Sequence, residues 1–284
     1  MILYKYVSFE AALTILKTKS LGFSHLEDFN DPFEGTALGV IQSDIEGISS
    51  DRFIQQCKDK FSRRFGVLSL TRAPLNPLMW SHYADSYNGV VIGIDTQKAG
   101  LEDIEKFMIP AQRGEIIYLA TAPKNPIELT QYEIQQIAEA IDIDKQKYED
   151  LCKRAFLYKS LYWAYEEEVR VVKNIYPAKF SYHSPYSREK IVDGQIWKRI
   201  SLGTRPIYTI EVPQEAFVEM YIGKNTSIDQ RKKYETSGGI VKDHIIPKFE
   251  ELRKICSDNN INFYRVDVDI EQWKLKSSLI NKVT

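Results

Sequence analysis

The chain has 284 residues, and its 43% hydrophobic content is typical of a folded globular protein with a sizeable core. Its 38 basic and 39 acidic residues leave a net charge of −1, which gives no overall electrostatic argument for binding nucleic acid or an anionic membrane. No stretch approaches the roughly 18 consecutive apolar residues of a membrane span, and the N-terminus is too mixed for a signal peptide, so we expect one cytoplasmic domain over residues 1–284 with no membrane partner.

Strands and short helices alternate in the first third of the chain. Residues 2–7 are predicted to form a strand, and the apolar spacing of residues 9–17 predicts an amphipathic helix with Ser8 as its N-cap. Asn, Asp, Pro and Gly in residues 29–35 predict a loop. Further elements are predicted at 21–24 (strand), 52–65 (helix), 67–71 (strand), 78–85 (helix opened by Pro77) and 90–95 (strand buried on both faces).

The rest of the chain is helical first and then rich in strands. Residues 123–165 are predicted to be mainly helical from the spacing of their apolar residues. The tail from about 272 to 284 is expected to be weakly ordered. Strands in the first and last thirds, joined by helices, predict an α+β fold. The later elements are predicted at 169–172, 196–202, 207–212 and 218–222 (strands), about 240–256 (helix) and 262–267 (strand).

The sequence lacks the short motifs of several common enzyme classes. It has no GxxxxGK[ST], no GxGxxG after a strand, no HExxH and no GxSxG, so P-loop, Rossmann, zincin and hydrolase assignments have no support. Cys57, Cys152 and Cys256 form no CxxC pair and are odd in number, which argues against a zinc knuckle and against a disulfide framework. We expect mostly buried thiols in a reducing compartment.

Polar and aromatic side chains are concentrated in residues 163–170, where an apolar strand begins. Glu166 and Glu168 are two residues apart at the strand entrance and are predicted to point to one side, with Glu167 pointing to the other. As a catalytic carboxylate, Glu168 would stabilise a cationic transition state, with Glu166 as its helper. The alternative is a solvated charge cluster in which Arg170 pairs with a neighbour.

A second concentration of such residues lies at 76–85. On a helix, Trp80 and Tyr83 share one face, while His82 and Asp85 share another. They are predicted either to form a pocket wall that stacks a planar ring, with His82 held by Asp85, or to form an aromatic core stripe with a hydrogen-bonded His. A metal site here is disfavoured because no second His is close in sequence.

Two smaller sets of residues each have a structural and a functional interpretation. Asn30, Asp31 and Glu34 form either a structural turn or a loop that closes over a ligand. Lys159 and Trp163 are one helical turn apart, so Lys159 either packs its stem on the indole or binds phosphate.

Several of these motifs, taken in order, resemble a widespread bacterial domain-of-unknown-function family. The resemblance extends to about residue 223 and covers most of the chain. The family itself implies no activity. The residues that carry it are LYKY at 3–6, FNDPFE at 29–34, MWSHYAD at 79–85, GVVIGI at 89–94, Lys159, Trp163, YEEEVR at 165–170 and YIG at 221–223.

The order of elements also resembles that of ADP-ribosyltransferases. The segment at 3–6 resembles their first strand, Ser69 the Ser of their middle strand, and residues 166–168 their Glu-x-Glu pattern. The resemblance implies a split mixed sheet with a helical insertion at about 123–165, and NAD as the substrate. It implies Glu168, Glu166 and Tyr83 as catalytic residues. The residues expected to bind NAD are Tyr4, Lys5, Tyr6, Asn30, Asp31, Ser69, Trp80, His82, Lys159 and Arg170.

The resemblance also implies a mechanism. Breaking the nicotinamide–ribose bond builds positive charge on the ribose, which a fixed carboxylate, here Glu168, stabilises. Tyr83 or Trp80 would hold the nicotinamide, and Glu166 would orient a protein or nucleic-acid acceptor. Lys5 stands where the pattern has His or Arg, and a Lys binds phosphate as a point charge without bidentate geometry. Similar transferases often act as toxins or phage-defence effectors, which extends to this chain only by analogy.

Two other functions remain open on the sequence. One is a non-catalytic module that binds nucleic acid or a nucleotide through Trp80, His82 and Lys159. The other is a metal-dependent nuclease, which would need a divalent cation held by acidic and imidazole ligands. Its candidate residues are Asp31, Glu34, His82, Asp85 and Glu168.

Overall fold

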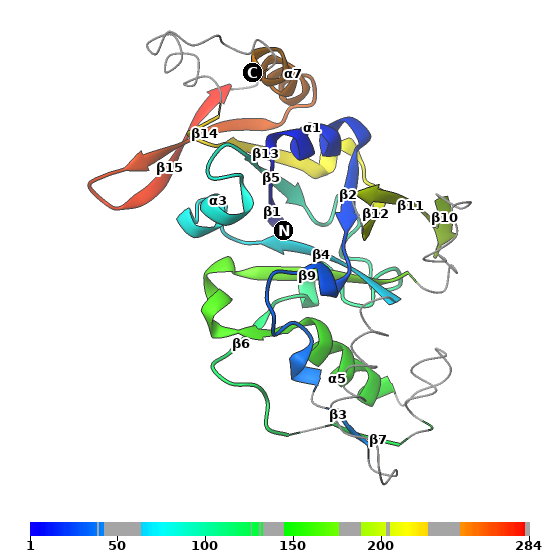
Figure 1. Ribbon diagram of the computed structural model, residues 1–284. Helices are drawn as coiled ribbons and strands as arrows, with labels where there is room; N and C mark the ends of the chain where they lie inside the picture. The colour runs from blue at the N-terminus through cyan, green and yellow to red at the C-terminus, as the bar shows by residue number, and fades with distance from the viewer. Residues whose placement is uncertain are drawn as a thin grey trace.

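The structure, a computed structural model, describes residues 1–38, 40–42, 64–125, 127–130, 132, 145–175, 189–202, 205–226 and 245–281. Strands and a few helices alternate along the described chain, which confirms the predicted α+β class (Figure 1). None of the described helices is long and apolar enough to cross a membrane. Cys57 and most of the helix predicted at 52–65 lie outside the described residues.

A seven-stranded mixed sheet forms the centre of the molecule, in the order β15-β14-β13-β5-β1-β4-β9. β13 and β14 run parallel, and the other neighbours are antiparallel. The strands are β1 (Ile2–Val7), β4 (Phe65–Thr71), β5 (Val90–Asp95), β9 (Glu168–Asn174), β13 (Phe217–Ile222), β14 (Asn262–Asp269) and β15 (Lys274–Asn281).

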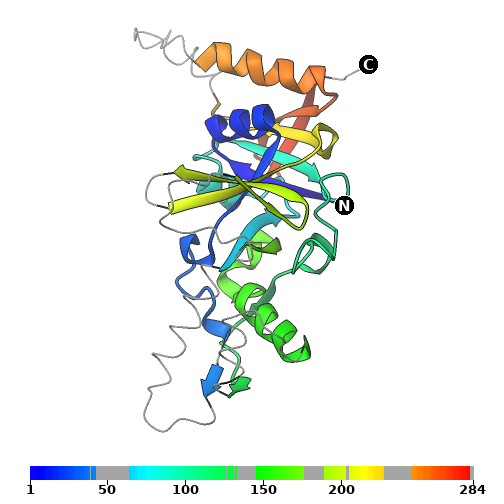
Figure 2. The same cartoon turned by 90° about the vertical axis from the view of Figure 1, so that its right-hand side faces the viewer.

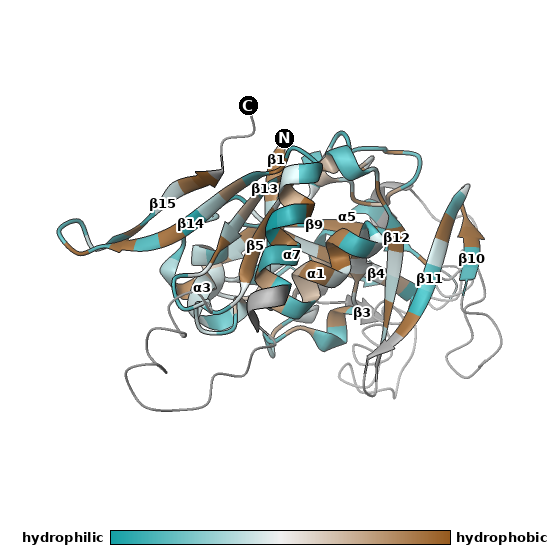
Figure 3. Cartoon of the chain, turned by 90° about the horizontal axis from the view of Figure 1, so that it is seen from above, coloured by the Kyte–Doolittle hydropathy of each residue, from teal (hydrophilic) through white to brown (hydrophobic). Residues whose placement is uncertain are grey.

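A second, antiparallel sheet of four strands has the order β10-β11-β12-β2. Its members are β10 (Glu189–Val192), β11 (Gln195–Leu202), β12 (Arg205–Glu211) and β2 (Ser20–Phe23). The strand β11 carries both hydrophobic and hydrophilic residues (Figure 3). Its Trp197 is buried in the main core, whereas Ile196 and Ile200 on the other face are 55% and 42% exposed. Two short parallel pairs complete the described strands: β3 (Val40–Gln42) with β7 (Ile127–Leu129), and β6 (Ile117–Leu119) with β8 (Tyr158–Ser160).

The helices begin where the sequence supplies a cap. Ser8 accepts a hydrogen bond from the backbone N–H of Ala11 at 3.3 Å, which confirms it as the N-cap of the first helix. Asn76 caps the helix opened by Pro77. Viewed from the side, α7, α1, the strands and α5 follow one another from top to bottom (Figure 2). The α-helices are α1 (Phe9–Thr18), α3 (Pro77–Tyr83), α5 (Lys145–Phe156) and α7 (Ile245–Asp258), and the 3₁₀ helices are η1 (Leu26–Asp28), η2 (Thr36–Leu38), η3 (Ala111–Arg113), η4 (Leu161–Glu166) and η6 (Gln214–Ala216).

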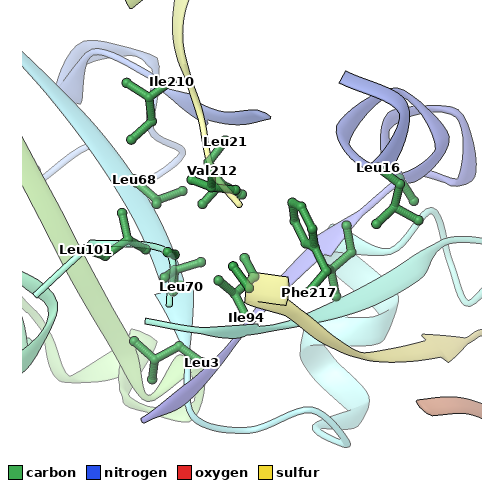
Figure 4. Close-up of a cluster of buried hydrophobic side chains, with 14 of the residues drawn as sticks. Leu3, Leu16, Leu21, Leu68, Leu70, Ile94, Leu101, Ile210, Val212 and Phe217 are labelled. Atoms are coloured by element: carbon green, nitrogen blue, oxygen red, sulfur yellow. The ribbon is translucent and has the colours of Figure 1, made fainter. Parts of the chain in front are cut away.

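The main hydrophobic core joins the two sheets to α1 and α7. Burial of its aliphatic and aromatic side chains removes apolar surface from water, which is the dominant favourable term in folding. The close-up shows side chains from β1, α1, β2, β4, β5, β12 and β13 in one cluster (Figure 4). A second cluster packs α5 against β4 and β9, and a third packs α3 against β1, β5 and β13. The large sheet is therefore covered on both of its faces.

The strands β1 and β4 meet at one end and then separate. Their register contains a single pair, Tyr4 opposite Thr71. Further along, the backbone of Val67 bonds instead to Ser24, which follows β2, with N–O distances of 2.8 and 3.0 Å. The strand β4 thus has β1 beside it at one end and the chain leaving β2 at the other.

Two stretches differ from their predicted structure. Of the segment predicted at 123–165, the structure describes residues 123–125, 127–130, 132 and 145–165, which contain α5 and η4 but also β7 and β8 of the two short parallel pairs. The tail expected to be weakly ordered forms β15, which pairs with β14 over residues 274–281. Its Leu275 is buried, so the strand packs one apolar side chain against the third core cluster.

Candidate functional site

A cleft of about 230 Å³ opens where β1 and β4 separate. Its walls come from β1, β2 and β4, from residues 28–31 after β2, from α3, and from the segment running from β8 through η4 into β9. The cleft brings together segments far apart in sequence, including Lys5, Ser69, Tyr83 and Glu168. Such a cleft with convergent polar groups is the usual place for a ligand.

The two predicted carboxylates point into this cleft, and the third does not. Glu167 has a positive φ of 44°, which turns the chain between η4 and β9. Glu166 and Glu168 are 4% and 2% exposed and line the cleft, whereas Glu167 is exposed to solvent. The prediction that Glu166 and Glu168 share one side is confirmed.

Four hydrogen bonds fix the carboxylate of Glu168. Its Oε1 accepts from the hydroxyl of Ser69 at 2.6 Å and from Nε of Arg170 at 2.8 Å. Its Oε2 accepts from Nζ of Lys159 at 2.9 Å and from Nη2 of Arg170 at 3.1 Å. The backbone N–H of Glu168 donates to the hydroxyl of Tyr118 at 2.9 Å. The position of this carboxylate is therefore determined by both its side-chain and its backbone contacts.

Arg170 is completely buried and joins three segments. Its guanidinium binds both oxygens of Glu34 and donates to the carbonyl of Phe156 at 2.7 Å. The guanidinium also lies 4.9 Å from the centre of the Phe29 ring. Arg170 thus pairs with neighbours, but in the protein interior and not at a solvated strand edge.

Lys159 connects the two cleft carboxylates. Its Nζ lies 2.5 Å from Oε2 of Glu166 and 2.9 Å from Oε2 of Glu168, and its side chain is 6% exposed. The same ammonium lies 5.1 Å from the centre of the Trp163 ring, so Lys159 does meet the indole, through its charged end and not through the predicted stem. Because Lys159 is engaged by carboxylates, the phosphate-binding interpretation has no support in this arrangement.

The helix α3 supplies Tyr83 to the cleft. Its N-cap Asn76 donates from Nδ2 to the carbonyl of Tyr165 at 2.7 Å, which ties the start of α3 to η4. At the other end of α3, the hydroxyl of Tyr83 donates to Oε1 of Glu166 at 2.6 Å. Burial and this hydrogen bond raise the pKa of Tyr83, so it is a neutral phenol at physiological pH.

The charged groups of the cleft have shifted pKa values. Burial would raise the pKa of Glu168, but the charges of Arg170 and Lys159 hold it at about 2. Burial raises the pKa of Glu34 against the opposing charge of Arg170. Burial lowers the pKa of Lys5 to about 8, while Glu168 acts in the opposite direction. Glu168 is therefore ionised at neutral pH.

The strand β1 contributes three neighbouring residues to the cleft. Nζ of Lys5 donates to the backbone carbonyl of Ser69 at 3.3 Å, across the gap between β1 and β4. The hydroxyl of Tyr4 donates to Oε2 of Glu219 at 3.0 Å, and that of Tyr6 donates to the carbonyl of Ala73 at 2.6 Å. Tyr4 and Tyr6 thus line the cleft with hydroxyls already engaged by protein acceptors, whereas Lys5 has a single hydrogen bond among the described residues.

The loop after β2 forms the opposing wall. Asn30 is exposed, Asp31 is 5% exposed, and both line the cleft beside Phe29. Oδ1 of Asp31 accepts from the backbone N–H of Phe33 at 2.9 Å, which is the turn-forming contact predicted for this motif. Glu34 at the end of the loop is paired with Arg170. The loop is therefore both a structural turn and a wall of the cleft.

Five residues proposed for binding or catalysis do not line the cleft: Glu34, Trp80, His82, Asp85 and Arg170. Arg170 is completely buried behind the cleft in its ion pairs with Glu34 and Glu168, so its predicted contact with NAD is wrong. The side chain of Trp80 is 0% exposed, packs against Tyr6 and Tyr87, and donates from Nε1 to the carbonyl of Pro74 at 2.9 Å. It belongs to the core, so its predicted stacking on a ligand is wrong. His82 and Asp85 are exposed and do not line the cleft. His82 lies on the exposed side of α3, whereas the helix predicted at 78–85 ends at Tyr83, and Asp85 lies beyond it in a turn with a φ of 47°.

These positions also bear on the two other functions. The proposed binding module needs Trp80, His82 and Lys159 on one surface, but the first is buried, the second is exposed and the third is paired with carboxylates. The proposed nuclease needs His82 near the acidic residues of the cleft, which it does not line. Among the residues that the structure describes, no group of three or more His, Cys, Asp or Glu is arranged to hold a metal ion.

The structure adds residues that sequence reasoning did not select. Phe29 lines the cleft as an aromatic wall, together with Trp163, which the sequence pairs with Lys159. The hydroxyl of Tyr118 accepts a hydrogen bond from the backbone N–H of Glu168. Thr71 donates from its hydroxyl to the carbonyl of Glu166 at 2.5 Å. Phe29 lies within the motif at 29–34, so its position beside charged residues was an available signal in the sequence, whereas nothing in the sequence marks Tyr118 or Thr71.

Part of this site lies in a segment that matches a known protein family. Residues 79–171 match the family described as protein of unknown function (DUF2971). The DUF2971 match confirms the resemblance to a family of unknown function, and it contains Tyr83, Lys159, Glu166, Glu168 and Arg170. Lys5, Asp31 and Ser69, which also line the cleft, precede the matched segment. Neither the curated proteins nor the solved structures gave a match to the chain.

Proposed function

We propose that the chain is an NAD-using enzyme of the ADP-ribosyltransferase type, which transfers ADP-ribose to a protein or nucleic-acid acceptor. The observation that carries this proposal is the 2.6 Å hydrogen bond from Ser69 to Glu168 in the cleft between β1 and β4. The resemblance noted in the sequence pairs a Ser on a middle strand with a Glu on a later one. The two residues lie 99 positions apart, so their contact is independent support for that pairing.

The charge of the cleft suits the proposed chemistry. Cleavage of the nicotinamide–ribose bond makes the ribose carbon positive, and a preorganised negative charge stabilises that transition state. Glu168 is ionised and held by four hydrogen bonds, so it need not reorient during the reaction. Lys159 and Arg170 offset only part of the negative charge, because three carboxylates, Glu34, Glu166 and Glu168, surround these two cations, leaving a formal charge of −1.

The remaining walls suit the parts of a dinucleotide. Tyr83, Phe29 and Trp163 offer aromatic surface to a planar nicotinamide ring. Lys5 offers a positive charge to a phosphate, in the place where the resembling pattern has His or Arg. A volume of about 230 Å³ is below the roughly 300–1,000 Å³ of typical ligand sites, so it suits the reacting half of NAD with the adenosine outside.

Glu166 is the residue that we assign to the acceptor. It lies beside Glu168, is bound by Tyr83 and Lys159, and faces the same cleft. A carboxylate in this position accepts a proton or a hydrogen bond from an attacking nucleophile. A toxin or phage-defence role would follow from such an activity, and growth of bacterial cells expressing the chain or its Glu168→Gln variant tests it.

Incubation of the purified chain with NAD, followed by chromatographic measurement of free nicotinamide, tests the proposal. We expect release by the wild type, a loss of roughly 100-fold or more in Glu168→Gln, and a smaller loss in Ser69→Ala. Glu115→Gln is the matched control, because Glu115 forms an exposed ion pair with Arg72 outside the cleft. Thermal unfolding of each variant separates loss of chemistry from loss of fold. Undiminished release by a folded Glu168→Gln protein rejects the assignment.

A further inference from the structure

One oxygen of Asp31 lacks a partner in the described structure. Oδ1 is occupied by the backbone N–H of Phe33 at 2.9 Å. Oδ2 is buried and has no hydrogen-bond partner among the described residues, and the residue as a whole is 5% exposed. Because Asp31 lines the cleft, the missing donor is one that a bound ligand is placed to supply.

An unpaired carboxylate oxygen away from water is unfavourable. Buried polar groups in folded proteins are nearly always hydrogen-bonded, and leaving one without a partner costs the full desolvation of that group. The turn itself does not require a carboxylate at position 31, because it uses Oδ1 alone and an Asn would also form it. A carboxylate at this position therefore fits an acceptor role toward a ligand.

The neighbours of Asp31 indicate which part of the ligand it faces. Asn30 interacts with the hydroxyl of Tyr83, and Phe29 stacks on Arg170. Asp31 thus belongs to the wall that carries the aromatic surfaces assigned above to the nicotinamide ring. The carboxamide group attached to that ring carries two N–H donors, which lie at the edge of the ring.

We propose that Asp31 recognises the carboxamide of nicotinamide, with Oδ2 accepting a hydrogen bond from one of its N–H groups. This inference rests on the proposed function and names the group by which the cleft selects its substrate. A carboxylate in place of the carboxamide has no N–H to donate and brings a like charge against Asp31. The chain therefore selects NAD over nicotinic acid adenine dinucleotide, which differs from NAD only in that group.

The variant Asp31→Asn tests this assignment with little change in shape. Its side-chain oxygen keeps the bond from the N–H of Phe33, and its amide nitrogen takes the place of Oδ2. The variant then offers a donor where the wild type offers an acceptor, and it removes the negative charge. We expect its preference to shift from the carboxamide toward the carboxylate.

A matched control is available outside the cleft. Asp103 forms the same turn, with Oδ1 accepting from the backbone N–H of Glu105 at 2.9 Å, and it does not line the cleft. Asp103→Asn makes the same chemical change in the same local geometry. Its selectivity between the two dinucleotides should equal that of the wild type.

The experiment measures binding of NAD and of nicotinic acid adenine dinucleotide by calorimetry for the wild type and both variants, with nicotinamide release from NAD in parallel. We expect the wild type to favour NAD by on the order of 100-fold, and Asp31→Asn to lower that ratio to about tenfold or less. If the wild type binds NAD but the ratio is unchanged in Asp31→Asn, the role of Asp31 is wrong and the proposed function stands. If the wild type neither binds nor cleaves NAD, both are wrong.

Discussion

Arg170 binds Glu34 through two parallel hydrogen bonds, from Nη1 to Oε2 at 2.9 Å and from Nη2 to Oε1 at 2.5 Å, although 136 residues separate them. The two side chains are 0% and 6% exposed. This contact anchors the loop that lines one wall of the cleft to the strand that carries Glu168.

Replacing Arg170 by Lys should destabilise the fold. A Lys keeps the charge but loses the planar fork that reaches Glu34 and Glu168 together, and it leaves buried carboxylates unpaired. We expect a loss of about 3–5 kcal/mol in the free energy of unfolding, measured by urea denaturation. Arg72→Lys is the control, because its ion pair with Glu115 is 40% and 69% exposed and should change stability by less than about 1 kcal/mol. Equal effects of the two substitutions would contradict the buried role of Arg170.

The stability of the fold should depend on Glu168 at acid pH. Burial would raise the pKa of this carboxyl, but Arg170 and Lys159 lower it from 4.5 to about 2 in the folded chain. A depressed folded pKa contributes stability that is fully present above pH 4.5 and is lost as pH falls toward 2, here on the order of 3 kcal/mol. The pKa of Glu34 is raised by burial and acts in the opposite direction, so the comparison is between the wild type and Glu168→Gln. Unfolding free energies measured from pH 7 to 2 should converge at the acid end, and a constant difference would count against the assignment.

Binding of NAD should weaken in mildly alkaline solution because of Lys5. Burial lowers the pKa of this ammonium to about 8, with Glu168 opposing the shift. The charged form therefore prevails below pH 8, and above it each further pH unit reduces the charged fraction about tenfold. We expect the affinity for the dinucleotide to fall between pH 7.5 and 9.5, and Lys5→Arg to remove that fall because its guanidinium stays charged. Lys98→Arg, an exposed substitution outside the cleft, should retain the wild-type pH profile.

The backbone at Gly114 packs so closely against β9 that a side chain should not fit there, and Gly100 provides a comparison. A Cβ on Gly114 would lie 1.8 Å from the carbonyl oxygen of Arg170, and the Gly114 carbonyl accepts the Arg170 N–H at 2.8 Å. Gly114→Ala should therefore push β9 away and lower stability by about 3 kcal/mol or more. Gly100→Ala meets no atom within 4 Å and carries only the strain of its φ of +68°, about 1 kcal/mol. Thermal unfolding of both variants gives the comparison, and similar melting temperatures would argue against the close approach.

The sequence predicts local geometry well wherever a short-range rule decides it. Alternation along a strand entrance predicts that Glu166 and Glu168 share one side with Glu167 opposite, and the structure has this arrangement, although Glu166 ends η4 and the turn at Glu167 produces it. Capping chemistry placed Ser8 at the start of α1. These rules depend on neighbours within a few residues, so they need no knowledge of the tertiary fold.

The same rules cannot say which face of an element meets the cleft. Helical spacing grouped Trp80 with Tyr83, but α3 packs so that the indole enters the core and only Tyr83 reaches the cleft. The pairing of Lys159 with Glu166 and Glu168 depends on the turn at Glu167. Glu167 has a left-handed backbone conformation there, which a Glu in the sequence does not predict. Tyr118 was not selected because its contact with Glu168 crosses 50 residues.

The side chain of Lys5 replaces a backbone hydrogen bond that β1 and β4 do not form. Its ammonium donates to the Ser69 carbonyl where the two strands have separated. The ammonium has three N–H donors and uses one of them for this contact, so it keeps its hydrogen bond to that carbonyl while it contacts a bound anion. One side chain therefore bridges two separated strands and leaves donors for a ligand.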